Sequence, residues 1–495
     1  MREERTIRTI CVVGAGIVGL SAAIAFARAL PAVRARIVAV PPDPAALADR
    51  LTGTLPTVNR FHAAIGLDEL ELVRAGIASH RLGTRFERWS ADGSAWYHAF
   101  GDFGLPTRAA DFHQLWVRAR KAGRALPFHR FGAAAVLAEA GKFVHPSQDP
   151  ASPMANHVYA LRLDPDRYRE RLEAQAGALA LDRFEGSIGG VTRREDGGIA
   201  ALVLEDGRRI EADLFIDCAG PSAPLLSVVA DDFEDWGGTL PCDRLLLAAG
   251  AAPPEPSSCD VAAALDVGWR WHSPLPDGVI AGAGYAAALA EEGQARRASG
   301  LERAELVAIR PGRRPRPWVS NVLAVGDSAV AVDPLHGTNL HLAQNAIARA
   351  LALLPGRDCH PLELREYNRQ TAQETDRVRD FLALHYLRSP RSEGAFWKAM
   401  PNRPLPASLA HTLELYGHRG RLPFYEEESF DRHGWHAVLL GMGLLPRGID
   451  PAASGVDFEQ SLAGMERLAE RLAGIVQRAP AYRDYLARMR SAGPR

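Results

Sequence analysis

A glycine-rich turn near the start of the chain constrains the fold most strongly. An apolar, β-rich run over residues 8–13 leads into Gly14, Gly16 and Gly19, and an alanine-rich helical run follows at once. Glycines at this spacing allow a tight turn and a close approach of the backbone to a pyrophosphate, whose charge meets the free N–H groups of the helix. With a second strand expected at residues 35–40, the pattern predicts a Rossmann-type βαβ unit that binds a dinucleotide.

The position that usually holds the ribose hydroxyls is not acidic in this chain. Dinucleotide-binding folds carry Asp or Glu about 20 residues after the turn, at the end of the second strand. Here the strand ends in Val40 and two prolines, so Asp43 is the candidate substitute. The alternative to nucleotide binding is a glycine turn that serves only the fold.

Charge and composition exclude several classes of protein. The 58 Lys and Arg residues balance 59 Asp and Glu residues, and a net charge of −1 lacks the basic footprint of a protein that binds nucleic acid or a membrane surface. The five cysteines are scattered and show no metal-ligand spacing, which argues against a disulfide framework or a zinc site. No apolar run resembles a signal peptide or a transmembrane helix, so we expect a cytoplasmic protein. From the cysteine spacing we also expect no metal ion.

A second motif, Gly326-Asp327-Ser328-Ala329, lies about 300 residues downstream, after the strand-like run NVLAV and before a helical run. A strand that ends in Gly-Asp places a carboxylate at the carboxyl edge of the sheet, where it can accept hydrogen bonds from the ribityl hydroxyls of a flavin. The pair of motifs is typical of FAD monooxygenases and favours FAD over NAD. The strand LFIDCAG, with Asp217 and Gly220, fits the third segment of such a fold.

On these motifs the sequence resembles the flavin-dependent halogenases, and the tryptophan-halogenase-like group in particular, over almost its whole length. Trp269, Trp271 and Pro274 in GWRWHSP are close to the family's Trp-x-Trp-x-Ile-Pro signature, with Ser273 in place of the isoleucine. Further segments that resemble the family are GTLP at 53–56 and residues 75–89, 159–165, 233–244, 333–347, 379–397 and 435–446.

The resemblance implies a set of site residues. The residues expected to bind the cofactor are Gly14, Ala15, Gly16, Gly19, Gly53, Thr54, Pro56, Gly326, Asp327, Pro334, Thr338 and Asn339. The backbone N–H groups of Thr338 and Asn339 are also expected to bind a halide. Trp269, Trp271 and Pro274 are expected to line a substrate tunnel, with packing in the core as the alternative.

Two positions depart from the family pattern. Arg81 stands where the family has its essential lysine, and a guanidinium is a permanent cation that is far less nucleophilic than an amine. His336 stands where the family has a glutamate, and histidine can act as an acid or a base near neutral pH. Arg81 and His336 are the candidate catalytic residues; the alternatives are a structural ion pair for Arg81 and a helix-capping role for His336.

The expected fold is α/β with a discontinuous Rossmann-like FAD-binding domain, a sheet-bearing substrate region and a helical C-terminal region. The FAD-binding domain is expected at residues 1–60, 155–225 and 305–355, the substrate region at 61–154 and 226–304, and the helical region at 356–495.

The resemblance implies that reduced FAD (FADH2) and oxygen are used to halogenate or oxygenate an electron-rich, indole-type aromatic, with chloride or bromide as the halide. No second dinucleotide motif is present for NADPH, so a separate flavin reductase is the expected partner, and a homodimer is possible. The alternatives are a flavin monooxygenase that does not halogenate, a hydroxylase that takes NADPH directly, and a flavin-binding family member without turnover.

Overall fold

The computed structural model describes residues 6–104, 110–155 and 157–491. The chain divides into two compact units, each assembled from three separated segments. The first unit contains residues 1–72, 163–237 and 307–376, and the second contains residues 73–162, 238–306 and 377–495.

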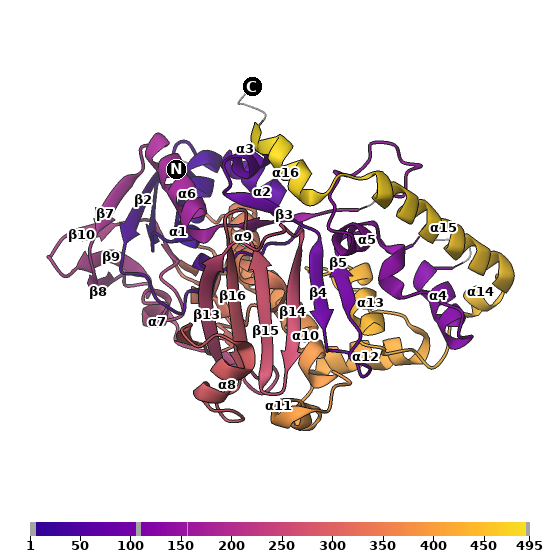
Figure 1. The fold of residues 1–495 in the computed structure, drawn as a ribbon. Helices are drawn as coiled ribbons and strands as arrows, with labels where there is room; N and C mark the ends of the chain where they lie inside the picture. Colours follow the sequence, from indigo (N-terminus) through magenta and orange to yellow (C-terminus); the bar gives the residue numbers. More distant parts are fainter. Residues whose placement is uncertain (1–5, 105–109, 156, 492–495) are drawn as a thin grey trace. The chain divides into compact units, whose positions relative to one another are not determined.

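A six-stranded sheet of order β19-β20-β11-β1-β2-β7 forms the centre of the first unit (Figure 1). All neighbours pair in parallel except β19 and β20. The strands are β1 (Thr9–Val13), β2 (Arg34–Ala39), β7 (Asp182–Glu185), β11 (Leu214–Asp217), β19 (Trp318–Val319) and β20 (Val322–Ala324). Parallel strands covered on both faces are apolar throughout, and β11 is accordingly buried at every position.

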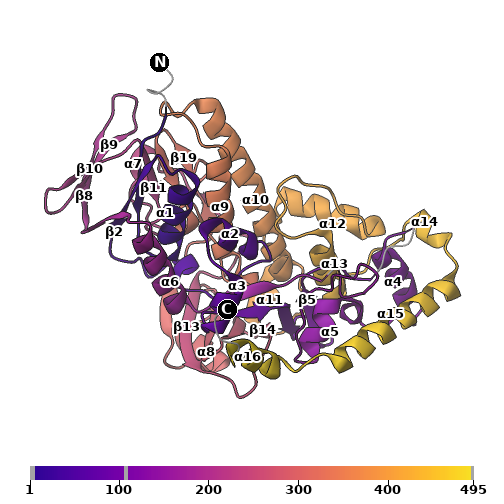
Figure 2. The same cartoon turned by 90° about the horizontal axis from the view of Figure 1, so that it is seen from above.

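Helices of the first unit pack on this sheet. Every residue of α1 (Ile17–Ala29) from Ile17 to Phe26 is buried, because α1 packs against β2, α6 (Pro165–Ala178) and α9 (Asn339–Ala352). The other elements of this unit include η2 (Leu47–Asp49), α2 (Val58–Ile65), α7 (Leu226–Val229), η4 (Gly326–Ser328) and η5 (Leu335–Gly337). The antiparallel sheet of β8 (Ile188–Arg193), β9 (Ile199–Leu204) and β10 (Arg209–Glu211) extends away from the parallel sheet in both ribbon views (Figures 1 and 2).

The second unit is built on a larger, mostly antiparallel sheet, in which β13, β16, β15, β14, β4 and β5 lie side by side (Figure 1). These strands are β13 (Arg244–Ala251), β14 (Cys259–Leu265), β15 (Gly268–Pro274), β16 (Gly278–Tyr285), β4 (Gly83–Glu87) and β5 (Trp96–Ala99). Only β14 and β4 among these neighbours pair in parallel. A separate two-stranded sheet joins β3 (Ala78–Arg81) and β6 (Ala160–Leu163).

Helices complete the second unit. The main ones are α4 (Phe112–Lys121), α5 (Ala133–Glu139), α12 (Ala407–Arg419), α13 (Arg432–Gly441), α15 (Phe458–Arg478) and α16 (Tyr482–Ser491). The amphipathic α15 packs against α4 and α5 through Leu462, Met465, Leu468, Leu472 and Val476. The long helix α10 (Pro361–Leu387) contains the division between the units, at Asp376.

The predicted α/β fold, with a discontinuous Rossmann-like domain, is confirmed. The predicted strand at residues 35–40 is β2, the helical run after NVLAV is α9, and the residues after 355 are largely helical. The three-part division predicted above stays a prediction; in the structure residues 356–376 group with the first unit and residues 377–495 with the second.

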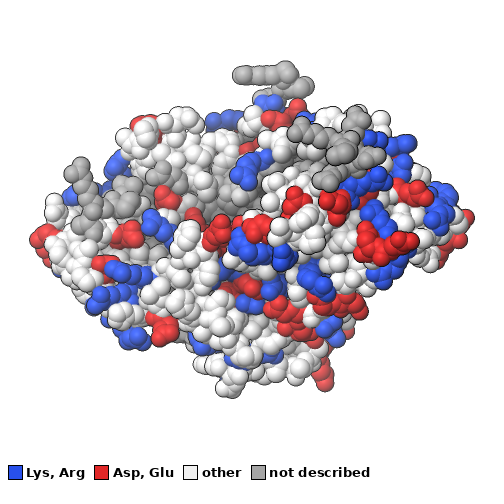
Figure 3. Space-filling view, turned by 180° about the vertical axis from the view of Figure 1, so that it is seen from behind, with Lys and Arg blue, Asp and Glu red and all other residues white. Residues whose placement is uncertain are grey.

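On the face shown in Figure 3, basic and acidic side chains lie interspersed. Within the described part of the chain, no helix combines the length and apolar character that crossing a membrane requires.

A buried polar network fixes α9 in the first unit. Thr57 Oγ1 lies 3.1 Å from His341 Nδ1, Arg349 donates to Glu374 over 2.9 Å, and Asn345 also donates to Glu374. Burial by itself would raise the pKa of Glu374, but Arg349 and His341 outweigh this effect and the pKa is lowered. Glu374 is therefore the anion on which a buried cation depends.

We predict that Glu374→Ala lowers the free energy of unfolding by about 3 kcal/mol, because it leaves Arg349 buried without its carboxylate. Glu366→Ala is the matched control on the same helix, since its pair with Arg369 is exposed, and we expect no measurable change. Chemical denaturation of the three proteins tests this; equal midpoints for all three would contradict it.

Candidate cofactor and active site

The predicted glycine turn lies at the carboxyl edge of the parallel sheet. Gly14 has a φ of 108°, in the region that favours glycine, and a Cβ built on it would overlap the carbonyl of Cys218, just after β11. A Cβ on Gly19 would overlap the Gly14 carbonyl. Side chains at these glycines would therefore not fit between the ends of β1 and β11 and the start of α1.

The N-terminus of α1 faces a carboxylate from another loop. Val18 N–H donates to Asp49 Oδ1 over 2.9 Å, and a Cβ on Gly16 would overlap the same carboxylate. Burial raises the pKa of Asp49 to about 6, against the stabilising effect of the Val18 and Ile17 amides. The candidate ribose ligand, Asp43, instead accepts a local hydrogen bond from Ala45 N over 2.8 Å.

Asp327, the acid of the second motif, lies in the η4 turn beside this loop. Its Oδ2 accepts from Ala48 N over 2.8 Å, and its Oδ1 has no hydrogen-bond partner among the described residues. The side chain is buried, and burial raises its pKa to about 8, with Asp49 as a further raising influence. The neighbouring acid Asp217 is committed to the fold, because its carboxylate accepts from Leu225 N, Leu226 N and Ala219 N.

The two loops that the family resemblance singled out lie against each other in the first unit. A Cβ on Gly53 would lie 2.9 Å from Gly337 Cα, so the segments 53–56 and 334–339 meet backbone to backbone. Thr54 is fully buried beside this contact, and Pro56 is partly exposed.

The second of these loops ends in the N-terminus of α9. Thr338 precedes α9 without capping it through its side chain, and its hydroxyl has no partner among the described residues. Asn339 donates to Val332 O over 2.9 Å. Thr338 therefore provides no side-chain acceptor for the first N–H groups of α9, and the N-terminus of a helix favours an anion.

His336 is held in an unfavourable conformation. Its φ of 67° places a non-glycine residue in the left-handed region, and its side chain is buried. Such backbone strain costs about 1–3 kcal/mol and is concentrated at functional sites. Thr338 lies directly before α9, two positions after His336, and both the catalytic and the helix-capping role of His336 stay predictions.

These features of the first unit fit a dinucleotide. The glycines of the turn carry no side chains, two helix N-termini have N–H donors, and Asp327 keeps a buried oxygen without a partner among the described residues.

Arg81 belongs to the second unit and is a buried, fixed cation. Its Nε lies 2.5 Å from Asp260 Oδ2, its Nη2 donates to Thr84 Oγ1 over 3.0 Å, and its guanidinium lies 5.3 Å from the centre of the Phe100 ring. Arg162 Nη1 reaches the other oxygen of Asp260 over 3.4 Å. One carboxylate therefore holds two guanidinium groups, which leaves Arg81 able to donate hydrogen bonds but not to act as a nucleophile.

The tryptophans of the predicted signature lie on β15 within an aromatic cluster. The ring centres of Trp269 and Trp271 are 5.1 Å apart, and Trp269 also contacts Trp89. Both signature tryptophans are buried, whereas Pro274 is partly exposed.

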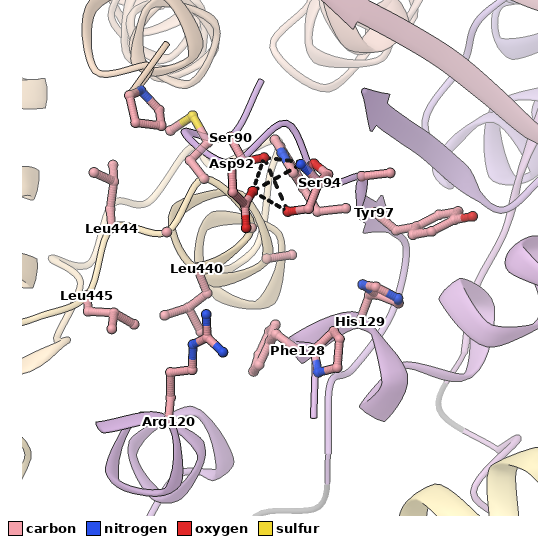
Figure 4. Close-up of a pocket in the computed structure, with 18 of the residues that line it drawn as sticks. Ser90, Asp92, Ser94, Tyr97, Arg120, Phe128, His129, Leu440, Leu444 and Leu445 are labelled. Carbon is pink, nitrogen blue, oxygen red and sulfur yellow. Dashed lines mark hydrogen bonds between the residues drawn. The ribbon is translucent and has the colours of Figure 1, made fainter. Parts of the chain in front are cut away.

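A cavity of about 500 Å³ opens elsewhere in the second unit (Figure 4). Tyr97, Phe128, Leu440 and Leu444 form part of its wall, and the Arg120 side chain points into it from α4. Its size is that of small-molecule sites in general. None of the predicted site residues is among the residues that line it, and we assign it no role in the reaction.

Comparison with known proteins agrees with this geometry. A family model of tryptophan halogenases matches residues 9–457. The structure of BrvH, a flavin-dependent halogenase from Brevundimonas sp. BAL3, superposes with a TM-score of 0.92 at 33% identity and covers 98% of this chain and 99% of that chain. Xcc4156, a flavin-dependent halogenase from Xanthomonas campestris, gives a TM-score of 0.91 at 30% identity and covers 99% of this chain and 100% of that chain.

Among curated proteins, the tryptophan 6-halogenase SttH of Streptomyces toxytricini is 27% identical over 484 residues, which are 88% of this chain and 90% of SttH. The chain belongs to the tryptophan halogenase family. The predicted resemblance is thereby confirmed, and with it the prediction of an FAD-dependent enzyme of the halogenase type.

Three acidic residues that the structure places beside predicted parts of the site were not predicted from the sequence. Asp49 meets the glycine turn, Asp260 holds Arg81, and Glu374 supports α9. None of the three belongs to a motif, because each meets its partner only through the fold. The one signal that the sequence offered was Arg81, because a buried cation requires a carboxylate partner somewhere in the chain.

We predict that the cofactor-free protein loses stability between pH 6.5 and pH 8.5 because of Asp327. A carboxyl whose pKa is raised stabilises the fold in its protonated form, fully below its unfolded value near 4 and progressively less as the pH rises to about 8. Asp327→Asn removes this loss, which amounts to about 2 kcal/mol over the interval.

Thermal unfolding at several pH values tests the prediction, with Asp206→Asn as the control at an exposed acid paired with Arg208. Parallel pH dependences of the wild-type and Asp327→Asn proteins would show that Asp327 is already ionised.

Proposed function

We propose that this enzyme uses reduced FAD and oxygen to halogenate an electron-rich aromatic substrate of the indole class. The observation that carries the proposal is the family match over residues 9–457, together with the glycine turn and Asp327 that fit the cofactor. The relatives named for tryptophan support the choice of an indole ring.

Within the first unit the proposed roles follow from the contacts. The N-termini of α1 and α9 supply N–H donors for the anionic parts of FAD and for a chloride or bromide ion at Thr338 and Asn339. Asp327 accepts hydrogen bonds from cofactor hydroxyls through its free oxygen. When bound, reduced FAD supplies the reaction with oxygen, which no side chain can perform.

The proposed catalytic residues act differently from those of the family pattern. Arg81 provides a permanent charge and hydrogen bonds at a fixed place, because Asp260 and Thr84 hold its guanidinium. His336, whose strained backbone fixes its direction, acts as a proton donor or acceptor. Trp269, Trp271 and Pro274 keep water from the substrate.

A separate flavin reductase is the proposed partner, since the sequence carries a single dinucleotide motif. A homodimer and a cytoplasmic location remain predictions from the sequence.

The direct experiment supplies the purified protein with FAD, a flavin reductase, NADH and a panel of indoles, in chloride, in bromide and without either halide. We expect products whose mass shifts match the halide supplied and which disappear without halide. Rapid reduction of the bound flavin by NADPH without the reductase would instead indicate a hydroxylase that takes NADPH directly. Flavin binding with no product under any condition would contradict the proposal and support a member without turnover.

A second candidate function is oxygenation of the same class of substrate without halogenation. It is favoured by the ion pair of Arg81 with Asp260, because a guanidinium cannot form the transient bond to halogen that an amine can. Oxygenated products that do not depend on halide would identify this activity.

The variant Arg81→Lys separates the two candidates. If Arg81 works as a fixed cation in halogenation, Arg81→Lys retains halogenated product and Arg81→Met loses at least about 90% of it, a change of about 1.4 kcal/mol or more in the barrier. Halogenation that appears only with lysine would show that the natural enzyme oxygenates.

Arg85→Lys is the matched control, because Arg85 lies four residues along the same segment and pairs with Glu87 at the surface. Substituting Arg81 removes the nearer cation of Asp260. Melting curves and FAD titrations of all variants therefore report whether each protein still folds and binds the cofactor.

A further inference from the structure

The N-terminus of α1 is occupied by an anion of the chain itself. Asp49 Oδ1 accepts from Val18 N over 2.9 Å, and its carboxylate lies so close over Gly16 that a single added carbon would overlap it. Gly16, the cap residue of α1, has no side chain to satisfy these amides. Asp49 therefore takes the place at which a bound pyrophosphate would meet the helix.

A second acid, Asp327, indicates that a ligand binds at this place. Asp327 is held on the adjoining residue of the same loop, through Ala48 N, and its buried Oδ1 has no partner among the described residues. Two carboxylates at one loop repel each other when both are ionised, and an acceptor without a donor is costly to bury. A ligand that donates hydroxyl hydrogen bonds to Asp327 would remove the second cost.

Both acids and a cation lie near Asp49. Besides Asp327 on η4, the acids near this pair include Asp43 in the preceding loop, and Asp217 is buried at the end of β11. The cation that acts on Asp49 is Arg169 of α6, which is also bonded to Glu173 over 3.2 Å. The titratable ring on α9 is His341, which lies within hydrogen-bond distance of Thr57 and whose pKa is lowered by burial.

We propose that Asp49 is an internal competitor of the cofactor phosphates: it holds the N-terminal amides of α1 in the FAD-free protein, and FAD binds by displacing it with the uptake of one proton. A pyrophosphate adds two negative charges beside Asp49 and Asp327, so protonation of Asp49 relieves the repulsion. Burial already raises the pKa of Asp49 to about 6 in the free protein. Near neutral pH, Asp49 therefore takes up a proton more readily than an ordinary carboxyl group does. The inference rests on the proposed use of FAD.

The alternative is that Asp49 is only a helix cap. In that case FAD and Asp49 occupy different places, and removing the charge weakens the helix without changing how cofactor affinity depends on pH.

The experiment titrates the full-length, FAD-free protein with FAD at several pH values between 6 and 8, following flavin fluorescence. For the wild type we expect the Kd to rise about tenfold for each pH unit, as for the uptake of one proton. Asp49→Asn keeps the shape and the hydrogen bond to Val18 N but carries no charge. It should bind FAD at least tenfold more tightly at pH 7.5, with a Kd that barely changes over this range.

Asp206→Asn is the control, since it removes an exposed acidic charge that is paired with Arg208, and it should keep the affinity and the pH dependence of the wild type. Calorimetry at pH 7 in phosphate and in Tris gives an independent count: close to one proton taken up per FAD by the wild type, and close to none by Asp49→Asn.

Equal affinities and equal pH dependences of the wild type and Asp49→Asn would overturn the inference while leaving the proposed function intact. FAD binding by none of the variants at any pH would overturn both.

Discussion

The backbone amides at the start of α1, which have no partner within the helix, are the constraint on which the first unit depends. An α-helix leaves its first four N–H groups without internal partners, and in this chain Gly16, the cap residue of α1, has no side chain to place over them. The glycines also let β1, β11 and α1 meet without intervening side chains. The same geometry that packs the sheet therefore creates a site for negative charge, and the rest of the unit either supplies that charge, through Asp49, or makes room for a ligand that does.

The second unit contains the opposite feature, which is a buried positive charge. Arg81 is buried on β3, and its cation is stable there because Asp260 on β14 accepts from it and from Arg162. A lysine would present one compact ammonium at this place, whereas the guanidinium spreads its charge over a planar group with five donors. At the position predicted to correspond to the family's lysine, the chain thus carries a cation whose chemistry differs from that of an amine.

The sequence predicts the fold well because its signals are local. The glycine turn, the strand that ends at Asp327 and the apolar runs of β1 and β11 each depend on neighbours within a few residues, and each is where we expect it. The contact of Gly53 with Gly337 was not predicted. The family resemblance indicated only that both loops lie near the cofactor, and nothing local joins two loops so far apart.

The acids that complete the site were not predictable. Asp260 meets Arg81 across 179 positions, and Asp49 reaches α1 from a loop with no motif. The sequence directed attention to Asp43, which stands nearer the usual ribose position, yet the carboxylate that meets the glycine turn comes from six residues further on because the chain folds back through η2. Such pairings depend on the path of the backbone, which no pattern in the residues records.

The most direct test of this account is a crystal structure of the protein grown with FAD and sodium bromide, with the bromide located by its anomalous scattering. The account predicts flavin density along the N-terminus of α1 and beside Asp327, with Asp49 moved off the helix, and bromide at the N–H groups of Thr338 and Asn339. Cofactor density elsewhere, with Asp49 still bonded to Val18, would contradict it.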